Sequence, residues 1–525
     1  MKRRNVLLGL GALGSLPGVG RARAQATAKT ISGGFDVGPG GLPGNFNPLA
    51  ATAGFTWFSL YLEPLITYDE TLSKVVGALA ERWEVGTELT SYTFHLAEAK
   101  WHDGQPFTSA DVAFTLGLAR NGASGSVFAG RLSTVDRVET PDARTVIIRL
   151  SRPNASMTDT LSRLMILPQH ALSAVPVAEL PRNSWWSTSP VGTGPFRFSR
   201  YVSGQYVELL ANPDYRGGAP RVGRVVNRYF ENTAGAVAAL RSGEIQFSYV
   251  EADDLPNFKG DNRFRIIEGS SYVVNYLGFN AEVPLWKDLR VRQAVMHAID
   301  RAAIVTSLYG GAATVANCAY VAPQLVPSGL DTYGYDPDKA QALLRAAGWN
   351  RINGDKPVTV LTYYTNALAA NVLAAIQSML AQVGINVVPR AVDVPTYNSI
   401  VYATGKTDPS QFPLIYAGLQ DGPDPSNINV GLNTSEIPPA GANVLRIDMP
   451  PLTEALNAAL AEIDPARRTD RYRDVCRTMN ANLPWGTLWV ANRYGVASTR
   501  LKDFVWTPAP GGGPYQARPE RWDIA

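Results

Sequence analysis

The hydrophobic pattern of this chain changes near residue 280, and this change constrains the fold more than any other feature. Before it, apolar and polar residues alternate, as in Tyr92–Leu96 and Val146–Leu150, with the period of a half-buried β-strand. Beyond it, helix and strand signals follow one another, which is typical of layered α/β domains. The sequence therefore predicts an α/β protein whose main boundary lies near residue 280.

Capping residues mark several expected helix boundaries. Thr108 with Asp111 three residues later predicts a capping box at a helix start. Asp288 is suited to cap a further helix. Asp336, which is followed by proline, predicts another helix start, and Gly348 predicts the end of that helix.

Length and charge narrow the class of protein. A chain of 525 residues is too long for one core and suits two or three domains, and 45% hydrophobic with 18% charged residues is an ordinary globular balance. The net charge is +3, but the first 26 residues hold five of the 48 basic residues and no acid. The remainder has 43 basic and 45 acidic residues, a net charge of −2. Without a basic surface stripe, we expect no nucleic-acid partner.

The start of the chain has the pattern of an export signal. A basic segment containing Arg3 and Arg4 precedes the short apolar segment Val6–Pro17, and cleavage is expected near Ala24 or Ala26. The adjacent arginines resemble a twin-arginine signal, although such pairs also occur in Sec signals. No cysteine follows the apolar segment and no later run reaches 18 apolar residues. We expect a periplasmic protein.

Only two cysteines are present, Cys318 and Cys476. In an oxidising compartment they could form a disulfide, but two separate buried thiols are also consistent with a separation of 158 positions. The four histidines are spread along the chain and form no metal-ligand motif. We therefore expect neither a metal nor a cofactor.

Four blocks of sequence, in their order and spacing, resemble the extracytoplasmic solute-binding proteins of family 5, the dipeptide and oligopeptide type. The blocks are Leu79–Val112, Pro190–Pro220, Tyr276–Arg301 and Tyr335–Trp349. The resemblance implies a periplasmic-binding-protein-like clam of type II, with two main lobes joined by two hinge crossings and with an extra inserted lobe. The implied divisions are an export signal at 1–26, lobe I at 27–53 with 190–275 and 488–525, the inserted lobe II at 54–189, and lobe III at 276–487.

The implied crossings between the main lobes lie near Tyr276–Asn280 and near Leu483–Thr487. A ligand enclosed between lobes must contact both of them, because only a difference in affinity shifts an open–closed equilibrium. Aromatic residues near the crossings are therefore candidate ligand contacts. They are Tyr272, Tyr276 and Trp485.

The segment Asp421–Pro425 is the strongest candidate binding element. In peptide-binding relatives, an acidic residue at the position of Asp421 pairs with the α-amino group of the ligand. An enclosed ammonium needs such a carboxylate, because its desolvation is otherwise uncompensated. Asp424 is a second candidate, and the alternative is that the whole segment is only a turn. Relatives usually carry a tryptophan just before this segment, where the present chain has Ala417–Leu419.

Two other motifs look chemical but are interpreted as structural. Val191–Pro195 is glycine-rich, yet it lacks the lysine and the spacing of a phosphate loop, so we expect a tight turn that leads back into lobe I. His102 and Asp103 are adjacent, so they would point to opposite faces of a strand rather than converge on a substrate.

These observations predict a non-enzymatic, monomeric binding protein that delivers a short peptide, or a similar amine-bearing solute, to an ABC permease in the inner membrane. An oligosaccharide, an opine or a metal chelate is the alternative ligand on the same fold. A secreted hydrolase is the alternative from another class, and the chain lacks a nucleophile or zinc-protease motif in a suitable context. Delivery to a chemoreceptor instead of a permease stays open.

Overall fold

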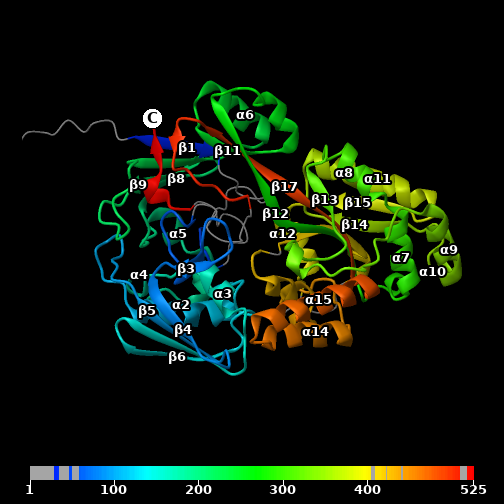
Figure 1. Ribbon diagram of the computed structural model, residues 1–525, viewed down its shortest axis with the longest axis horizontal. Helices are drawn as coiled ribbons and strands as arrows, with labels where there is room; N and C mark the ends of the chain where they lie inside the picture. The colour runs from blue at the N-terminus through cyan, green and yellow to red at the C-terminus, as the bar shows by residue number, and fades with distance from the viewer. Residues whose placement is uncertain are drawn as a thin grey trace, which may run out of the picture.

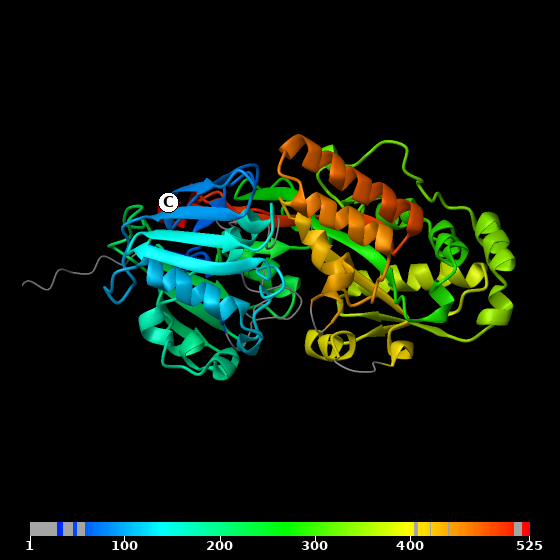
Figure 2. The same ribbon diagram turned by 90° about the horizontal axis from the view of Figure 1, so that it is seen from below.

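The computed structural model describes residues 29–34, 46–49, 58–403, 408–420, 422–438, 441–508 and 517–525. The predicted export signal lies outside these residues. The chain forms two main halves, and two long antiparallel strands pass between them, β12 (Phe264–Phe279) and β17 (Trp485–Ser498) (Figure 1). The view from below shows the same two halves on either side of this strand pair (Figure 2).

An 11-stranded sheet continues from one half into the other through β12 and β17. On one side, the order β11-β1-β10-β9-β8 builds lobe I, and on the other side the order β16-β14-β15 builds lobe III. The lobe I strands are β1 (Thr30–Gly34), β8 (Phe196–Val202), β9 (Tyr206–Ala211), β10 (Arg224–Arg228) and β11 (Phe247–Val250). The lobe III strands are β13 (Ala313–Val315), β14 (Val358–Thr362), β15 (Val387–Ala391) and β16 (Leu414–Gln420).

A separate four-stranded antiparallel sheet builds the inserted lobe. Its strands are β4 (Ala80–Val85), β5 (Ser91–Leu96), β7 (Thr145–Leu150) and β6 (Val135–Asp142), in that order. The two predicted strands are neighbours, with Tyr92 opposite Ile148 and Phe94 opposite Val146, and these four side chains are buried. Period-two alternation therefore identified the core-facing residues correctly.

Short strands and helices complete lobe II and lobe I. In lobe II these are β2 (Ile66–Tyr68), β3 (Val75–Gly77), α2 (Ser109–Arg120), α3 (Met157–Arg163), α4 (Gln169–Leu172) and α5 (Trp185–Thr188). In lobe I, α6 (Thr233–Ser242) packs on β11, and β18 (Leu501–Lys502) pairs with β19 (Asp523–Ile524). The start of α2 has the predicted capping box, in which the backbone N–H of Thr108 donates to Asp111 Oδ2 at 2.9 Å.

Helices cover both faces of the lobe III strands. They are α7 (Leu289–Ala298), α8 (Arg301–Ser307), α9 (Pro337–Ala347), α10 (Trp349–Ile352), α11 (Ala367–Gln382), α12 (Val394–Val401), α13 (Asn429–Leu432), α14 (Pro450–Ala461) and α15 (Pro465–Asn482). The expected caps are confirmed: Asp288 and Asp336 accept backbone N–H bonds, and Gly348 has φ +75°. None of the described helices is long and apolar enough to cross a membrane.

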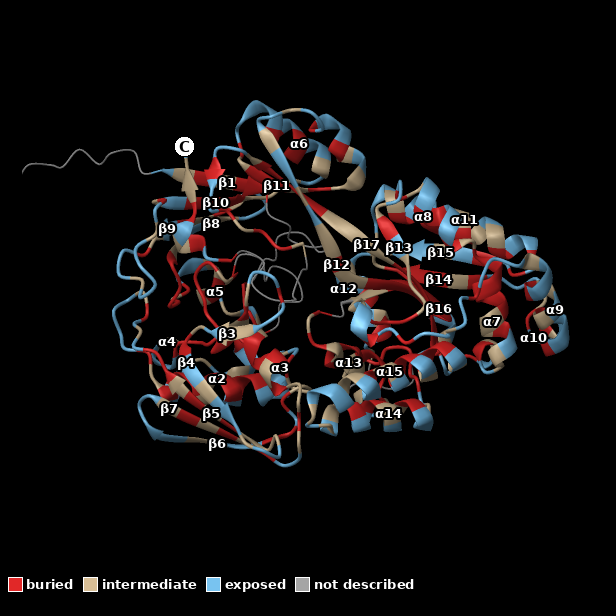
Figure 3. Cartoon of the chain, viewed as in Figure 1, coloured by how far each residue is buried: buried red, intermediate tan, exposed pale blue. Residues whose placement is uncertain are grey.

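The hydrophobic cores show which lobes are joined rigidly. One continuous buried cluster contains residues of lobe I and of the inserted lobe, from Ile31 through Phe94 and Leu161 to Trp522. Lobe III has two clusters of its own, one on each face of its strands. Figure 3 shows buried residues along β14 and β16 and exposed outer faces on α9 and α14. Lobes I and II therefore form one packed unit, and lobe III forms the other.

The strand pair between the halves is irregular at two points. The register of β12 against β17 shifts between Ser270 and Val274 and again between Asn275 and Tyr276, and Tyr272 within the first irregularity has φ +53°. A bulky residue with positive φ is strained and persists only where its surroundings hold it. The predicted crossings, near Tyr276–Asn280 and Leu483–Thr487, lie on the lobe III side of the first irregularity. The lobe boundaries themselves remain a prediction.

Cys318 and Cys476 form a disulfide, with their Cα atoms 5.6 Å apart. The bond connects the segment after β13 to α15, and both residues are buried in lobe III. Of the two possibilities left open by the sequence, the structure contains the bonded one.

Candidate functional site

The segment that carries Asp421 lies where lobe III meets both the hinge and the inserted lobe. Asp421 itself is outside the described residues, but the residues on each side of it are placed. In the β-ladder, Gln420 of β16 is opposite Val273 of the hinge strand β12. On the other side, Gly422 lies against Arg163 of the inserted lobe. The two residues that flank Asp421 belong to lobe III, and they border the hinge strand and the inserted lobe.

Asp424 is held by a buried ion pair. Its two carboxylate oxygens each accept a hydrogen bond from the Arg468 guanidinium at 3.0 Å, and Oδ1 also accepts from the Ser426 backbone N–H at 2.8 Å. Only 11% of the Asp424 side chain and 18% of the Arg468 side chain are exposed. Burial alone would raise the pKa of Asp424, but the Arg468 charge and hydrogen bonds lower it below its usual value. The carboxylate is ionised and fully engaged with Arg468.

A second buried carboxylate, Asp159 on α3, faces this region from the inserted lobe. It accepts from the Tyr68 hydroxyl at 3.2 Å and from Arg163 Nη2 at 3.1 Å, and Arg131 Nη1 lies 3.7 Å from its other oxygen. Asp159 is fully buried, whereas 13% of Arg163 and 22% of Arg131 are exposed. Two guanidinium groups thus share one carboxylate, which leaves the cluster with a net positive charge facing lobe III.

The charged groups of this cluster and those of lobe III shift one another's pKa values. The pKa of Arg131 is lowered to about 10, mainly by burial and also by the neighbouring Arg163, while Asp159, Glu436 and Asp424 oppose the shift. Burial raises the pKa of Glu436, and the Arg131 charge partly offsets this effect. The backbone also joins the lobes, since the Ala155 N–H donates to the Leu460 carbonyl oxygen at 3.2 Å. In Figure 1, α14 and α15 lie next to the inserted lobe.

Tyr272 connects the hinge to the same region. Its side chain is half-buried and packs against the small apolar cluster of Tyr68 and Leu72 in the inserted lobe. Tyr68 is also the residue that donates to Asp159. Of the three predicted aromatic contacts, Tyr272 is the one that borders both main units of the fold.

The other two predicted aromatic residues, Tyr276 and Trp485, stack on each other inside lobe III. Their ring centroids are 4.3 Å apart at an interplanar angle of 25°, and they are 6% and 2% exposed. Among the described residues, Trp485 Nε1 is one of the buried polar atoms without a hydrogen-bond partner. Tyr276 belongs to β12 and Trp485 to β17, so both rings are core residues of lobe III at the hinge strands.

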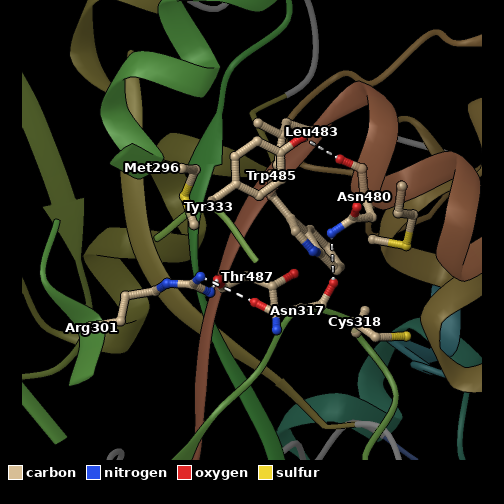
Figure 4. Close-up of a pocket in the computed structure, with 11 residues that line it drawn as sticks. Met296, Arg301, Asn317, Cys318, Tyr333, Asn480, Leu483, Trp485 and Thr487 are labelled. Atoms are coloured by element: carbon tan, nitrogen blue, oxygen red, sulfur yellow. Dashed lines mark hydrogen bonds between the residues drawn. The ribbon is translucent and has the colours of Figure 1, made fainter. Parts of the chain in front are cut away.

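Trp485 borders a small cavity, which Figure 4 shows. Asn480 and Arg301 fix its polar side: Asn480 Nδ2 donates to the Asn317 carbonyl at 3.1 Å, and Arg301 Nη2 donates to Asn317 Oδ1, also at 3.1 Å. The free volume is about 10 Å³, enough for about one water molecule. This cavity is too small for a peptide side chain, so it is not the ligand site.

Two tyrosines that the sequence analysis missed, Tyr363 and Tyr364, lie against Gly418, in the segment where relatives usually carry a tryptophan. A Cβ atom on Gly418 would lie 2.5 Å from Val273 Cγ1 and in contact with the Tyr364 hydroxyl, so only glycine fits there. The Tyr363 hydroxyl donates to the Gly418 carbonyl oxygen at 3.2 Å. Both tyrosines follow β14 directly, and two aromatic residues at the end of a buried strand were the available signal.

The glycine-rich turn Val191–Pro195 joins lobe II to lobe I, as expected. The Gly194 N–H donates to the Tyr61 carbonyl oxygen at 3.0 Å. His102 closes the turn: the Gly192 N–H donates to His102 Nδ1 at 3.2 Å, so Nε2 carries the proton and donates to the Gly194 carbonyl oxygen at 3.0 Å. Asp103 turns away and accepts from His170 at 2.8 Å. The two adjacent residues thus have separate structural partners.

This arrangement predicts that protonation of His102 destabilises the fold. Burial lowers the pKa of His102 to about 4, from an ordinary value near 6.5. The neutral ring therefore contributes its full stability above pH 6.5, and this contribution is lost as the pH falls toward 4. We expect a loss of roughly 1–2 kcal/mol over this window. Urea unfolding between pH 4.5 and 7.5 measures it.

The His102→Gln variant should have a flatter pH profile, because its side chain does not titrate. His95→Gln is the matched control, since His95 lies on β5 with 28% of its side chain exposed. An unchanged slope in His102→Gln would show that other groups carry the pH dependence.

The chain is similar to known proteins in both sequence and fold. The model of the bacterial extracellular solute-binding proteins, family 5 (middle region), matches residues 74–436. A Brucella melitensis protein named "Putative ABC transporter peptide-binding protein" is 64% identical over 503 residues, which is 96% of this chain and 95% of that protein. The oligopeptide-binding protein AppA of Bacillus subtilis, solved with a nonapeptide, has a TM-score of 0.83 at 24% identity and covers 94% of this chain and 99% of its own.

NikZ of Campylobacter jejuni, solved with Ni(L-His), gives a TM-score of 0.80 at 24% identity, with 94% of this chain and 99% of that chain covered. At these identities the two structures inform on the fold alone. Both confirm the predicted type II clam, in which two main lobes are joined by two strands and carry an inserted lobe.

Proposed function

The chain belongs to family 5 of the bacterial extracellular solute-binding proteins, and on this premise we propose that it binds a short peptide, or a similar amine-bearing solute, between its lobes. The bound solute is delivered to the permease of an ABC importer, with the chain acting in the periplasm as a monomer after its signal is removed. The matched family is one of solute-binding proteins, so we propose no catalytic step and set the secreted hydrolase aside.

The observation that carries the proposal is the position of the residues that flank Asp421. Gln420 pairs with the hinge strand and Gly422 contacts the inserted lobe, so a ligand bound to the intervening residue would touch both closing units. Binding of this kind favours the closed state, because the ligand gains contacts there that it lacks in the open state.

We assign the ligand ammonium to Asp421 and a supporting role to Asp424. Both oxygens of Asp424 are bound to Arg468, so its charge is already compensated within lobe III. An enclosed ammonium needs a carboxylate of its own. Tyr272, which borders both units, is the aromatic residue we expect against the ligand. The stacked rings of Tyr276 and Trp485 support the hinge strands from within lobe III.

Thermal unfolding of residues 27–525 against a panel of solutes tests the ligand class. The panel contains alanine peptides of two to nine residues, oligosaccharides, an opine and nickel–histidine. A ligand that binds only the native state should add about 2.7 kcal/mol of stability at a hundredfold excess over its dissociation constant. Stabilisation by peptides supports the proposal. Stabilisation by sugars, the opine or the chelate alone would overturn it and leave the alternative ligands.

Asp421→Asn should weaken binding of an alanine peptide with a free amino group by about 2–5 kcal/mol, because an ammonium would then be enclosed without its partner charge. The same peptide with an acetylated N-terminus should bind the wild type weakly, and its affinity should change little in the variant. Isothermal titration calorimetry measures both affinities.

Asp470→Asn is the matched control, because Asp470 lies on α15 with 69% of its side chain exposed. The amine assignment is wrong if Asp421→Asn binds the free and acetylated peptides as the wild type does. A peptide ligand would then be recognised through other groups.

A further inference from the structure

The inserted lobe closes on lobe III through a defined set of contacts. Because lobes I and II share one continuous core, we expect them to move as a unit against lobe III. Contacts between lobe II and lobe III are therefore contacts that form on closure. The bond from Ala155 to Leu460 and the approach of Arg163 to Gly422 are two of them.

Arg163 of the inserted lobe lies directly against the binding segment. Its Nη2 atom would lie 2.5 Å from a Cβ atom placed on Gly422, and Gly422 has φ +77°. Glycine suits this position for two reasons. The backbone is left-handed, and the Arg163 guanidinium occupies the space that a side chain would need. The planar end of Arg163 thus rests directly on the backbone of the turn that leads from Gly422 to Asp424.

The position of Arg163 is fixed from behind by Asp159. Arg163 donates to Asp159 Oδ1 at 3.1 Å within α3, and the fully buried carboxylate is held in turn by the Tyr68 hydroxyl at 3.2 Å. A buried carboxylate with several donors fixes their geometry, because moving any donor leaves part of its charge uncompensated. Arg163 is therefore a rigid support and not a free surface side chain.

The same network reaches the hinge. Tyr68 packs with Leu72 against Tyr272, whose positive φ lies within the first of the two register shifts of β12. A contiguous series of contacts thus runs from Tyr272 through Tyr68, Asp159 and Arg163 to Gly422. It connects the hinge strand β12 with the turn that begins at Gly422.

From this juxtaposition we infer that Arg163 is a positioning residue for ligand binding. Through Asp159 and Tyr68, it holds the Gly422–Asp424 turn and the Tyr272 hinge in their closed arrangement together. The inserted lobe then takes part in closing the protein around its ligand, in addition to packing on lobe I. The inference rests on the proposed function in one respect, since the turn it positions directly follows Asp421.

Hydrogen exchange of the protein without ligand tests this inference. Arg163→Met keeps the length of the side chain and removes the guanidinium. We expect amide exchange in residues 424–428 and 270–274 to accelerate at least tenfold, and the radius of gyration by X-ray scattering to increase. Arg163→Lys, which retains the charge near Asp159, should recover part of both effects. Arg137→Met is the matched control, because Arg137 is a lobe II arginine with 62% of its side chain exposed.

The inference is overturned if Arg163→Met accelerates exchange only within α3, or not at all, with an unchanged radius of gyration. A double-mutant cycle of Gly422 and Arg163 tests their contact independently. Gly422→Ala should lower the melting temperature less in an Arg163→Ala background than in the wild type, because the clash with the guanidinium is relieved; equal shifts would contradict the contact. Neither measurement uses a ligand, so a failure of alanine peptides to bind would refute the proposed function without affecting this result.

Discussion

Replacing Asp424 by asparagine should lower the free energy of unfolding by about 3–5 kcal/mol. The substitution removes the charge that compensates Arg468, whose guanidinium is 18% exposed and donates two hydrogen bonds to this carboxylate. An uncompensated buried guanidinium costs more than the pair contributes, since its desolvation is no longer offset. Urea denaturation followed by circular dichroism measures the change as a shift of the midpoint.

The double variant Asp424→Leu with Arg468→Met should be less destabilised than Arg468→Met alone. Both partners are then apolar, so no buried charge is left without compensation. The exposed pair Asp470–Arg473 provides the control, since breaking it should cost about 1 kcal/mol or less. Equal losses in the single and double variants would show that the pair acts through packing and not through charge.

The pair also predicts a pH dependence of definite sign. Arg468 keeps the pKa of Asp424 below its ordinary value despite burial. A carboxylate with a depressed pKa in the folded state contributes its stability fully above its unfolded pKa, near 3.9, and loses it as the pH falls through the lower folded value. Asp424→Asn should therefore be closest in stability to the wild type in strong acid and most different at neutral pH.

The elements that sequence reasoning located are those with local physical causes. Alternation marked Tyr92–Leu96 because a strand with one buried face must alternate. Asp288 and Asp336 marked helix starts because their carboxylates accept the unpaired N–H groups of the first turn. In each case, the determining interaction lies within four residues of its signal.

The hinge and the surroundings of the binding segment depend on contacts that are distant in sequence. The register shift at Ser270–Val274 has no local signal, because tyrosine is a poor residue for a positive φ and nothing nearby announces Tyr272. The partner of Asp424 is 44 positions away. The spacing of Asp159 and Arg163 does indicate a helical ion pair, but not that the pair faces another lobe.

Removing the disulfide by replacing Cys318 and Cys476 with alanine should lower the free energy of unfolding by about 3–5 kcal/mol. The bond joins positions 158 apart, and a cross-link that closes a long loop restricts the unfolded chain strongly. The folded state should change little, because the same segment and helix are also joined by Asn480, whose amide donates to the Asn317 and Asp331 carbonyl oxygens at 3.1 and 2.9 Å.

Urea unfolding of the oxidised wild type, the reduced wild type and the double alanine variant distinguishes the stability contributed by the disulfide from that contributed by the cysteine side chains. The reduced wild type should unfold near the variant, and a reductant should leave the variant unchanged. If the variant instead unfolds at the same urea concentration as the oxidised wild type, the unfolded chain is not restricted by the bond. In the expected case, the cross-link stabilises lobe III as a whole, including the stacked pair of Tyr276 and Trp485 in the same core cluster.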